Sequence, residues 1–202
     1  MQVTTIYFMR HSEALKPINI ENNDSLQLQN EKWILTSNGE NIAKKISETE
    51  ELKDFDMVFS SNYVRAICTA KYFTNNKIHI VESFGERKFG INSWDEMPVD
   101  FEKKQWADFD YQVGNGESLN KVKERELNAL AEILTKHKNK KILIVGHSTA
   151  LATLFSNWCD IDYSGYKYNG EIFFNGKWNY CETFKLVFDD ENNLKSIKNL
   201  KF

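Results

Sequence analysis

The feature that most constrains this chain is an alternation between short apolar segments and amphipathic helical segments. Lys141 to Val145 (KILIV) is the clearest apolar segment, and it runs through Gly146 and His147 into a helix expected at Ala150 to Trp158. Apolar, β-branched runs of this length are typical of strands buried on both faces. Strands that alternate with helices predict a mostly parallel sheet with right-handed crossovers.

Three further apolar segments have the same form. We predict strands at Val3 to Met9, Asp56 to Ser61 and Lys77 to Val81, and helices from Leu35 through Ile46, at Asn62 to Phe73 and at Ser118 to Lys138. A polar loop of roughly 20 residues is expected after the first strand. Towards the end of the chain, alternating residues predict antiparallel edge strands at Glu171 to Phe174, Trp178 to Tyr180 and Thr183 to Phe188. The expected fold class is therefore α/β: a three-layer α/β/α sandwich with a mostly parallel mixed sheet.

The domain organisation is predicted to be simple. Two prolines and nine glycines are spread over 202 residues, without a repeat or a Gly/Ser linker, so we expect a single domain over residues 1–202. Residues 91–116 differ in composition, because aromatic side chains alternate there with acids. We interpret this segment as a small lid insertion.

Charge and cysteine content exclude several classes of protein. The formal net charge of -3 gives no general attraction to nucleic acid or to an anionic membrane. No apolar run approaches the ~20 residues of a membrane span, and the first residues lack the features of a signal peptide. Three scattered cysteines fit a reducing compartment. We therefore expect a cytoplasmic protein with neither nucleic acid nor membrane as a partner.

Cationic and titratable side chains follow the predicted strands. Arg10 and His11 end the first strand, Arg65 falls in the first turn of the helix after the second, and His147 follows the strand KILIV, while Glu86 lies in a loop. The carboxyl ends of parallel strands share one edge of the sheet, where open α/β sheets bind ligands. These side chains are therefore predicted to converge.

The predicted cluster suits a phosphoryl group. Arginine matches phosphate oxygens bidentately, and helix N-termini offer free N–H donors. A neutral imidazole is a nucleophile near pH 7, and a protonated carboxyl group could supply a proton to the leaving group. We find no metal-ligand cluster and no nucleotide-binding glycine loop, so neither a metal nor a cofactor is expected.

Six motifs, in order along the chain, resemble those of the histidine phosphatase superfamily, in its phosphoglycerate-mutase-like branch. The family's Arg-His-Gly-Glu, Leu-Thr-x-x-Gly and Ser-Ser-x-x-x-Arg-Ala-x-x-Thr-Ala are matched by Arg10 to Glu13, Leu35 to Gly39 and Ser60 to Ala70. Its Glu-Arg-x-x-Gly, Gly-Glu-Ser and strand-Gly/Ser-His-Gly are matched by Glu86 to Gly90, Gly116 to Ser118 and Ile142 to His147. The resemblance covers nearly the whole chain.

The resemblance implies a role for each matching residue. His11 would be the nucleophile that forms a phosphohistidine, and Glu86 the general acid and later the base. The phosphoryl group would be bound by Arg10, Arg65 and His147. Ser12 and Ser148 stand where the family commonly has glycine, and we expect their hydroxyls to point toward the phosphate.

Two departures from the pattern favour a phosphatase over a mutase. Ala14, Lys16 and Pro17 occupy the stretch where mutases carry serine and asparagine, so a phosphate contact is lost or replaced by Lys16. The long basic insertion of the mutases is missing, because Gly90 to Glu117 holds seven acids against Lys103 and Lys104.

The function predicted from the sequence is a metal-independent phosphomonoesterase that acts on a small organic phosphate ester through a phosphohistidine and releases inorganic phosphate. The alternatives are a phosphoglycerate mutase and a binding module for phosphorylated ligands without catalytic activity. Sugar phosphates, nucleoside phosphates, phosphoserine and phosphoglycerates all stay open as substrates, as does the oligomeric state.

Overall fold

A mixed six-stranded sheet forms the centre of the computed structural model, which describes residues 3–15 and 24–202. Its strand order is β3-β2-β4-β1-β8-β9. The first four in this order are parallel to one another, and β8 and β9 are antiparallel additions. The strands are β1 (Thr4–Arg10), β2 (Met57–Ser60), β3 (Ile78–Ile80), β4 (Lys141–Gly146), β8 (Thr183–Phe188) and β9 (Leu194–Leu200).

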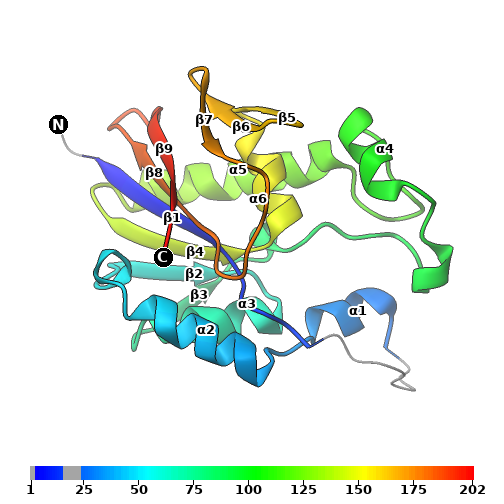
Figure 1. Ribbon diagram of the computed structural model, residues 1–202, viewed down its shortest axis with the longest axis horizontal. Helices are drawn as coiled ribbons and strands as arrows, with labels where there is room; N and C mark the ends of the chain where they lie inside the picture. Colours follow the sequence, from blue (N-terminus) through cyan, green and yellow to red (C-terminus); the bar gives the residue numbers. More distant parts are fainter. Residues whose placement is uncertain (1–2, 16–23) are drawn as a thin grey trace.

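Helices cover both faces of this sheet, as Figure 1 shows, so the predicted three-layer α/β/α architecture is confirmed. One face packs against α5 (Leu119–Lys136) and α6 (Ser148–Phe155), and the other against α2 (Ser37–Ser47) and α3 (Val64–Ala70). Short 3-10 turns complete the connections: η1 (Glu50–Leu52), η2 (Lys71–Phe73) and η3 (Glu82–Phe84).

The alternation of side chains along the central strands explains the two cores. In β1, Ile6 and Phe8 pack with α5 and α6, whereas Tyr7 and Met9 pack with α2 and α3. Successive side chains of a strand point to opposite faces, so a strand covered on both faces must be apolar at nearly every position. This requirement accounts for the continuous apolar runs of the sequence.

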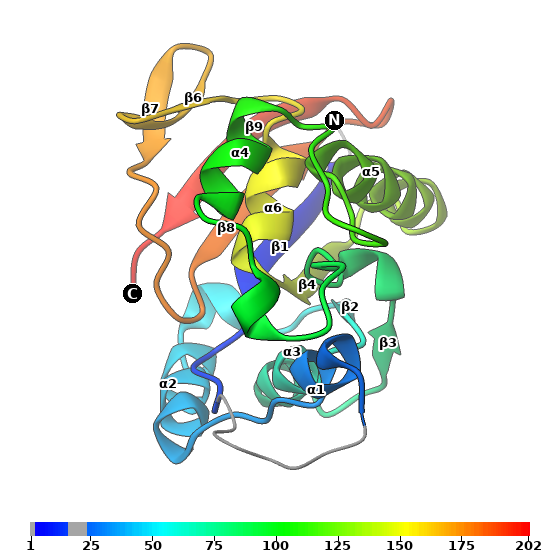
Figure 2. The ribbon, with the colours of Figure 1, turned by 90° about the vertical axis from the view of Figure 1, so that its right-hand side faces the viewer.

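A second sheet was not anticipated. It contains β5 (Asp160–Asp162), β6 (Gly165–Tyr168) and β7 (Glu171–Phe174) in that order, all antiparallel. Figure 2 shows it beyond the end of α6. The strand expected at Glu171 to Phe174 exists, but it pairs with β6 instead of extending the main sheet.

Two expectations about loops and strands were wrong. The polar segment after β1 contains a helix, α1 (Leu26–Glu31), whose first turn is capped by Ser25. The strand expected at Trp178 to Tyr180 is a loop, because Glu182 binds the backbone N–H of Asn179 and the chain turns at Cys181 with a φ of +53°. The helix α1 and the loop at 178–180 both contribute to the site described below.

The segment at residues 91–116 contains η4 (Trp94–Glu96) and α4 (Phe101–Ala107). Phe89, Trp94, Phe101 and Tyr111 form a chain of ring contacts between 5.3 and 6.1 Å. The two ends of the segment lie in close contact, because a Cβ on its last residue, Gly116, would come within 2.7 Å of the backbone of Phe89, which lies just before the segment. The aromatic side chains therefore largely serve the packing of the segment itself.

Candidate functional site

The carboxyl ends of β1, β2 and β4 lie side by side and bring four of the predicted site residues together. The register pairs Arg10 with Gly146 and Ser60 with Val145, so the residues that follow each strand share one edge. The rings of His11 and His147 have centroids 5.1 Å apart. The predicted convergence of Arg10, His11, Arg65 and His147 is thus present in the structure.

Arg65 joins the two histidines. It begins the first turn of α3 and is 4% exposed. Its Nε–H donates to Nε2 of His11 at 3.1 Å, and one terminal nitrogen donates to Nδ1 of His147 at 3.3 Å. Burial lowers the pKa of Arg65 to about 10, so the guanidinium stays charged at neutral pH.

These contacts assign the tautomer of His11. Nδ1 lies 2.6 Å from the carbonyl oxygen of Ser12, and a carbonyl can only accept, so Nδ1 carries the proton. Nε2 accepts from Arg65 and therefore carries the lone pair. Burial and then the charge of Arg65 hold the pKa of His11 well below its usual value. The ring is thus a neutral imidazole whose unprotonated Nε2 accepts from Arg65.

His147 is held in the opposite tautomer. Its Nδ1 accepts from Arg65, so Nε2–H donates to the hydroxyl of Ser61 at 2.8 Å. The ring is completely buried and lies against the ring of Tyr63 at a centroid distance of 4.5 Å. Burial and the neighbouring cations hold its pKa well below the usual value.

Two elements that were absent from the prediction support the arginines. The carbonyl of Asn30 in α1 accepts from Arg65 at 2.6 Å, and the carbonyl of Trp178 accepts from Arg10 at 3.0 Å. The buried Nε of Arg10 has no hydrogen-bond partner within the described part of the chain. Arg10 therefore keeps a donor that a bound anion could use.

Aromatic rings line the Arg65 guanidinium. Its Cζ lies 4.6 Å from the Tyr63 ring centroid and 5.4 Å from that of Trp33. Sequence reasoning did not single out Tyr63, Trp33 or Asn30. Tyr63 alone carried a signal, because it stands inside the Ser60 to Ala70 motif.

The loop after β1 is fixed by the start of α2. The Thr36 hydroxyl donates to the carboxylate of Glu13 at 2.6 Å and accepts from the backbone N–H of Gly39 at 2.8 Å. A Cβ on Gly39 would lie 2.1 Å from the carbonyl oxygen of Glu13. The motifs Arg-His-x-Glu and Leu-Thr-x-x-Gly thus pack directly against each other, and this packing fixes the backbone that follows His11.

The two serines differ from each other in their surroundings. The completely buried Ser12 donates its hydroxyl to the Gly39 carbonyl at 2.6 Å, which argues against the phosphate contact expected from the sequence. Ser148 is partly buried and is the first residue of α6. The expected contact of Lys16 falls outside the described residues.

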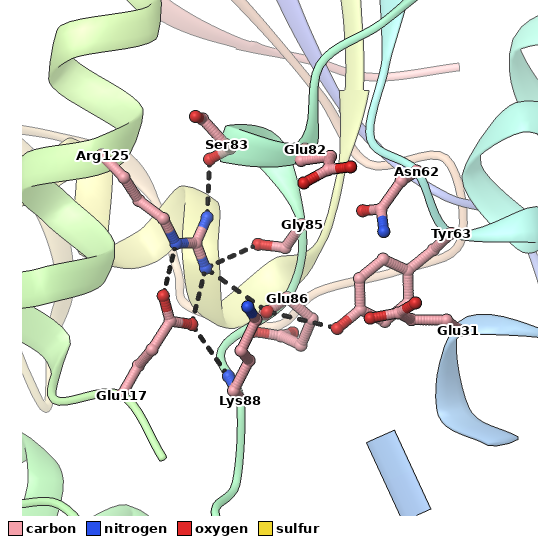
Figure 3. A pocket seen from close by; sticks show the side chains of 10 residues that line it. All are labelled: Glu31, Asn62, Tyr63, Glu82, Ser83, Gly85, Glu86, Lys88, Glu117 and Arg125. Atoms are coloured by element: carbon pink, nitrogen blue, oxygen red, sulfur yellow. Dashed lines mark hydrogen bonds and ion pairs between the residues drawn. The ribbon is translucent and has the colours of Figure 1, made fainter. Parts of the chain in front are cut away.

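Glu86 lies on the loop that follows η3, near the two arginines of the site. Its charge acts on both Arg10 and Arg65, and its Oε1 accepts from the backbone N–H of Arg87 at 2.9 Å. It borders a cavity of about 330 Å³, drawn in Figure 3. The cavity wall carries four carboxylates, Glu31, Glu82, Glu86 and Glu117, against Lys88 and Arg125.

No group of three or more metal-ligating side chains with a suitable arrangement occurs among the residues that the structure describes. Within those residues, no helix is both long and apolar enough to cross a membrane.

The geometry is that of an anion site, lined by two imidazoles and two guanidinium groups, at the carboxyl edge of an α/β sheet. A family model described as histidine phosphatase superfamily (branch 1) matches residues 6–191, and the chain belongs to this superfamily.

Similar proteins carry related names. The chain is 29% identical to the uncharacterized phosphatase PhoE of Bacillus subtilis (strain 168) over 126 residues, which cover 60% of this chain and 63% of that protein. A mutant phosphoserine phosphatase from Entamoeba histolytica in complex with phosphoserine has a TM-score of 0.66 at 18% identity, covering 96% of each chain. Phosphoglycerate mutase from Bacillus anthracis str. Sterne has a TM-score of 0.65 at 18% identity, covering 98% of this chain and 93% of its own. A phosphatase and a mutase thus share this fold.

Proposed function

We propose that this protein is a metal-independent phosphomonoesterase that hydrolyses a small organic phosphate ester through a phosphohistidine on His11. The observation that carries the proposal is the position of Arg65, which donates to Nε2 of His11 and to Nδ1 of His147. A phosphoryl group that took the place of these acceptors on the guanidinium would lie beside Nε2 of His11 and release its lone pair for attack. The proposal takes residues 1–202 as one domain.

The first half of the reaction transfers the phosphoryl group to the protein. Nε2 of His11 attacks phosphorus, the bond from phosphorus to the ester oxygen breaks, and the electron pair of that bond goes to the leaving oxygen. Glu86 in its acid form gives that oxygen a proton, so the product leaves as an alcohol. Arg10 and Arg65 hold the phosphoryl oxygens as their charge redistributes, and His147 joins them when it takes up a proton on Nδ1 and becomes a donor there.

The second half regenerates the protein. Glu86, now a carboxylate, takes a proton from water, and the water oxygen attacks phosphorus. The bond between phosphorus and nitrogen breaks, and its electron pair returns to Nε2 of His11. The sum is ester plus water giving alcohol plus inorganic phosphate, with Glu86 again protonated.

The charge of the cavity beside Glu86 favours hydrolysis over mutase chemistry. A mutase must bind carboxylated mono- and bisphosphates, whereas four carboxylates line this cavity. Arg125 is already paired with Glu117, so among the described residues of the lining Lys88 is the cation without an ion pair. Such a wall favours a neutral or hydroxylated leaving group.

Two measurements test the proposal. Purified protein should hydrolyse p-nitrophenyl phosphate in the presence of EDTA, and rapid acid-free quenching should trap phosphate on His11. His11→Ala should abolish both signals while its circular dichroism stays that of the wild type. Retained turnover in that variant would refute the nucleophile.

The same assay separates the alternatives. Interconversion of 2- and 3-phosphoglycerate with a bisphosphate primer, faster than phosphate release, would show a mutase. Phosphate binding without turnover of any ester in a phosphometabolite panel would show a binding module.

A further inference from the structure

The loop that carries Glu86 is held on both sides by one partly buried ion pair, Glu117–Arg125. Arg125 lies on α5, and its Nε donates to Oε1 of Glu117 at 2.8 Å. Their side chains are 21% and 15% exposed, respectively. Figure 3 shows the pair standing directly beside the Glu86 loop.

Arg125 holds the loop on the N-terminal side of the Glu86 side chain. Its terminal nitrogens donate to the carbonyl oxygens of Ser83 at 2.6 Å, Gly85 at 3.0 Å and Glu86 at 3.3 Å. A guanidinium has N–H donors fixed in one plane, so three carbonyls and a carboxylate bound together define the path of the loop. The Tyr63 hydroxyl also donates to the Glu86 carbonyl at 3.3 Å.

Glu117 holds the loop on the other side. Its Oε2 accepts from the backbone N–H of Lys88 at 2.9 Å, and its own backbone N–H donates to the Lys88 carbonyl at 2.8 Å. Burial opposes ionisation of Glu117, but the hydrogen bonds and charge of Arg125 outweigh burial and lower its pKa. The pair is therefore charged at neutral pH, and it fixes residues 83–88 around the proposed acid.

We infer that Glu117 and Arg125 are positioning residues for general acid catalysis by Glu86. The inference rests on the proposed function, because it takes Glu86 as the proton donor. Neither residue touches the phosphoryl site, so their action is to hold the Glu86 backbone where its carboxyl group reaches the leaving oxygen. A displacement of about 1 Å in such a group costs on the order of 100-fold in rate.

A series of substituted phenyl phosphates separates this role from a merely structural one. The need for a proton donor grows with the basicity of the leaving group, so a working general acid flattens the dependence of kcat/KM on leaving-group pKa. We expect kcat/KM to depend weakly on leaving-group pKa in the wild type and strongly in Arg125→Met. Relative to the wild type, Arg125→Met should lose about 100-fold in kcat/KM when phenol is the leaving group and less than about threefold when p-nitrophenol is. Glu117→Gln, which keeps an acceptor for Lys88, should fall between them.

Three comparisons interpret the result. Lys121→Met removes an exposed cation from the same helix and should leave the wild-type dependence. If kcat/KM of Glu86→Gln depends on leaving-group pKa as weakly as that of the wild type, Glu86 is not the general acid. If the dependence is steep in Glu86→Gln but shallow in folded Arg125→Met, the positioning role is overturned and the proposed function stands. Should Arg125→Met fail to fold by circular dichroism, Glu117→Gln decides on the same criterion.

Discussion

The Nε atom of Arg65 lies 3.1 Å from Nε2 of His11, so a permanent cation faces the nitrogen that we propose as the nucleophile. The charge of Arg65 disfavours protonation of the His11 imidazole. Together with burial it holds the pKa of His11 well below 6.5. A nucleophile tuned in this way stays neutral in mildly acidic solution.

The first prediction concerns this pKa. Arg65→Met removes the cation, so the pKa of His11 should rise toward 6.5, and the midpoint of its ring titration, followed by NMR, should move to higher pH. Lys71→Met, which removes an exposed cation just after the same helix, should leave that midpoint unchanged. An identical midpoint in Arg65→Met would mean that burial and the charge of Arg10 set the pKa of His11 without Arg65.

The positions of His11, Arg65 and His147 could be predicted because each follows a strand or begins a helix whose pattern is local. Parallel strands necessarily bring their carboxyl ends together, so three local patterns define one site. Asn30 and Trp178 could not be predicted in the same way. They contribute backbone carbonyls, which every residue has, and only the tertiary placement of the short helix α1 and of the loop at Trp178 brings them to the arginines.

The helices and strands, too, could be predicted from the sequence only in part. The apolar runs KILIV and VTTIYFM predict strands because burial on two faces demands apolar residues at each position. The six-residue helix Leu26–Glu31 has few apolar positions, and it depends on a serine cap and on burial of Leu26 and Asn30. The pairing of β7 with β6 was missed for a different reason, because it is a local hairpin across the two-residue turn Asn169–Gly170, whose φ values are +51° and +82°.

The second prediction distinguishes a structural Ser12 from a phosphate-binding one. Its hydroxyl donates to the Gly39 carbonyl, so Ser12→Ala should lower the free energy of unfolding by about 1 kcal/mol, the usual net value of such a bond. The KM for p-nitrophenyl phosphate should change less than about twofold, because binding rests on other groups. Urea unfolding and steady-state kinetics on the same preparation measure both values. A large rise in KM with unchanged stability would restore the phosphate contact.

The third prediction concerns selectivity for the leaving group. Glu82 lines the cavity beside Glu86, and Glu82→Lys reverses one charge of its wall. The ratio of kcat/KM for 3-phosphoglycerate to that for glycerol phosphate should rise by up to about fivefold, since an ion pair at an exposed position contributes at most about 1 kcal/mol. Glu171→Lys makes the same charge change on the small sheet and should not alter the ratio. An equal rise in both variants would indicate a general effect of net charge.

The last prediction concerns Glu126, which lies on the buried face of α5 with Val122 and Leu130. It is completely buried, and neither carboxyl oxygen has a hydrogen-bond partner in the described part of the chain. Burial raises its pKa well above 4.5, with Arg125 opposing the shift and Glu86 and Glu117 adding to it. The folded protein therefore retains a proton on Glu126 that the unfolded chain releases above about pH 4.5.

Because the unfolded state then binds fewer protons, the contribution of Glu126 to stability falls as pH rises from about 4.5 toward the pKa in the folded state, by up to about 1.4 kcal/mol per pH unit. Glu126→Gln removes this titration. Urea titrations at pH 5 and pH 8 give the free energy of unfolding of the variant and of the wild type. The difference, variant minus wild type, should be more positive at pH 8 than at pH 5 by at least about 1 kcal/mol. Glu124→Gln, an exposed change on the same helix, should give a difference independent of pH. The same independence in Glu126→Gln would mean that water or a local opening solvates the carboxylate.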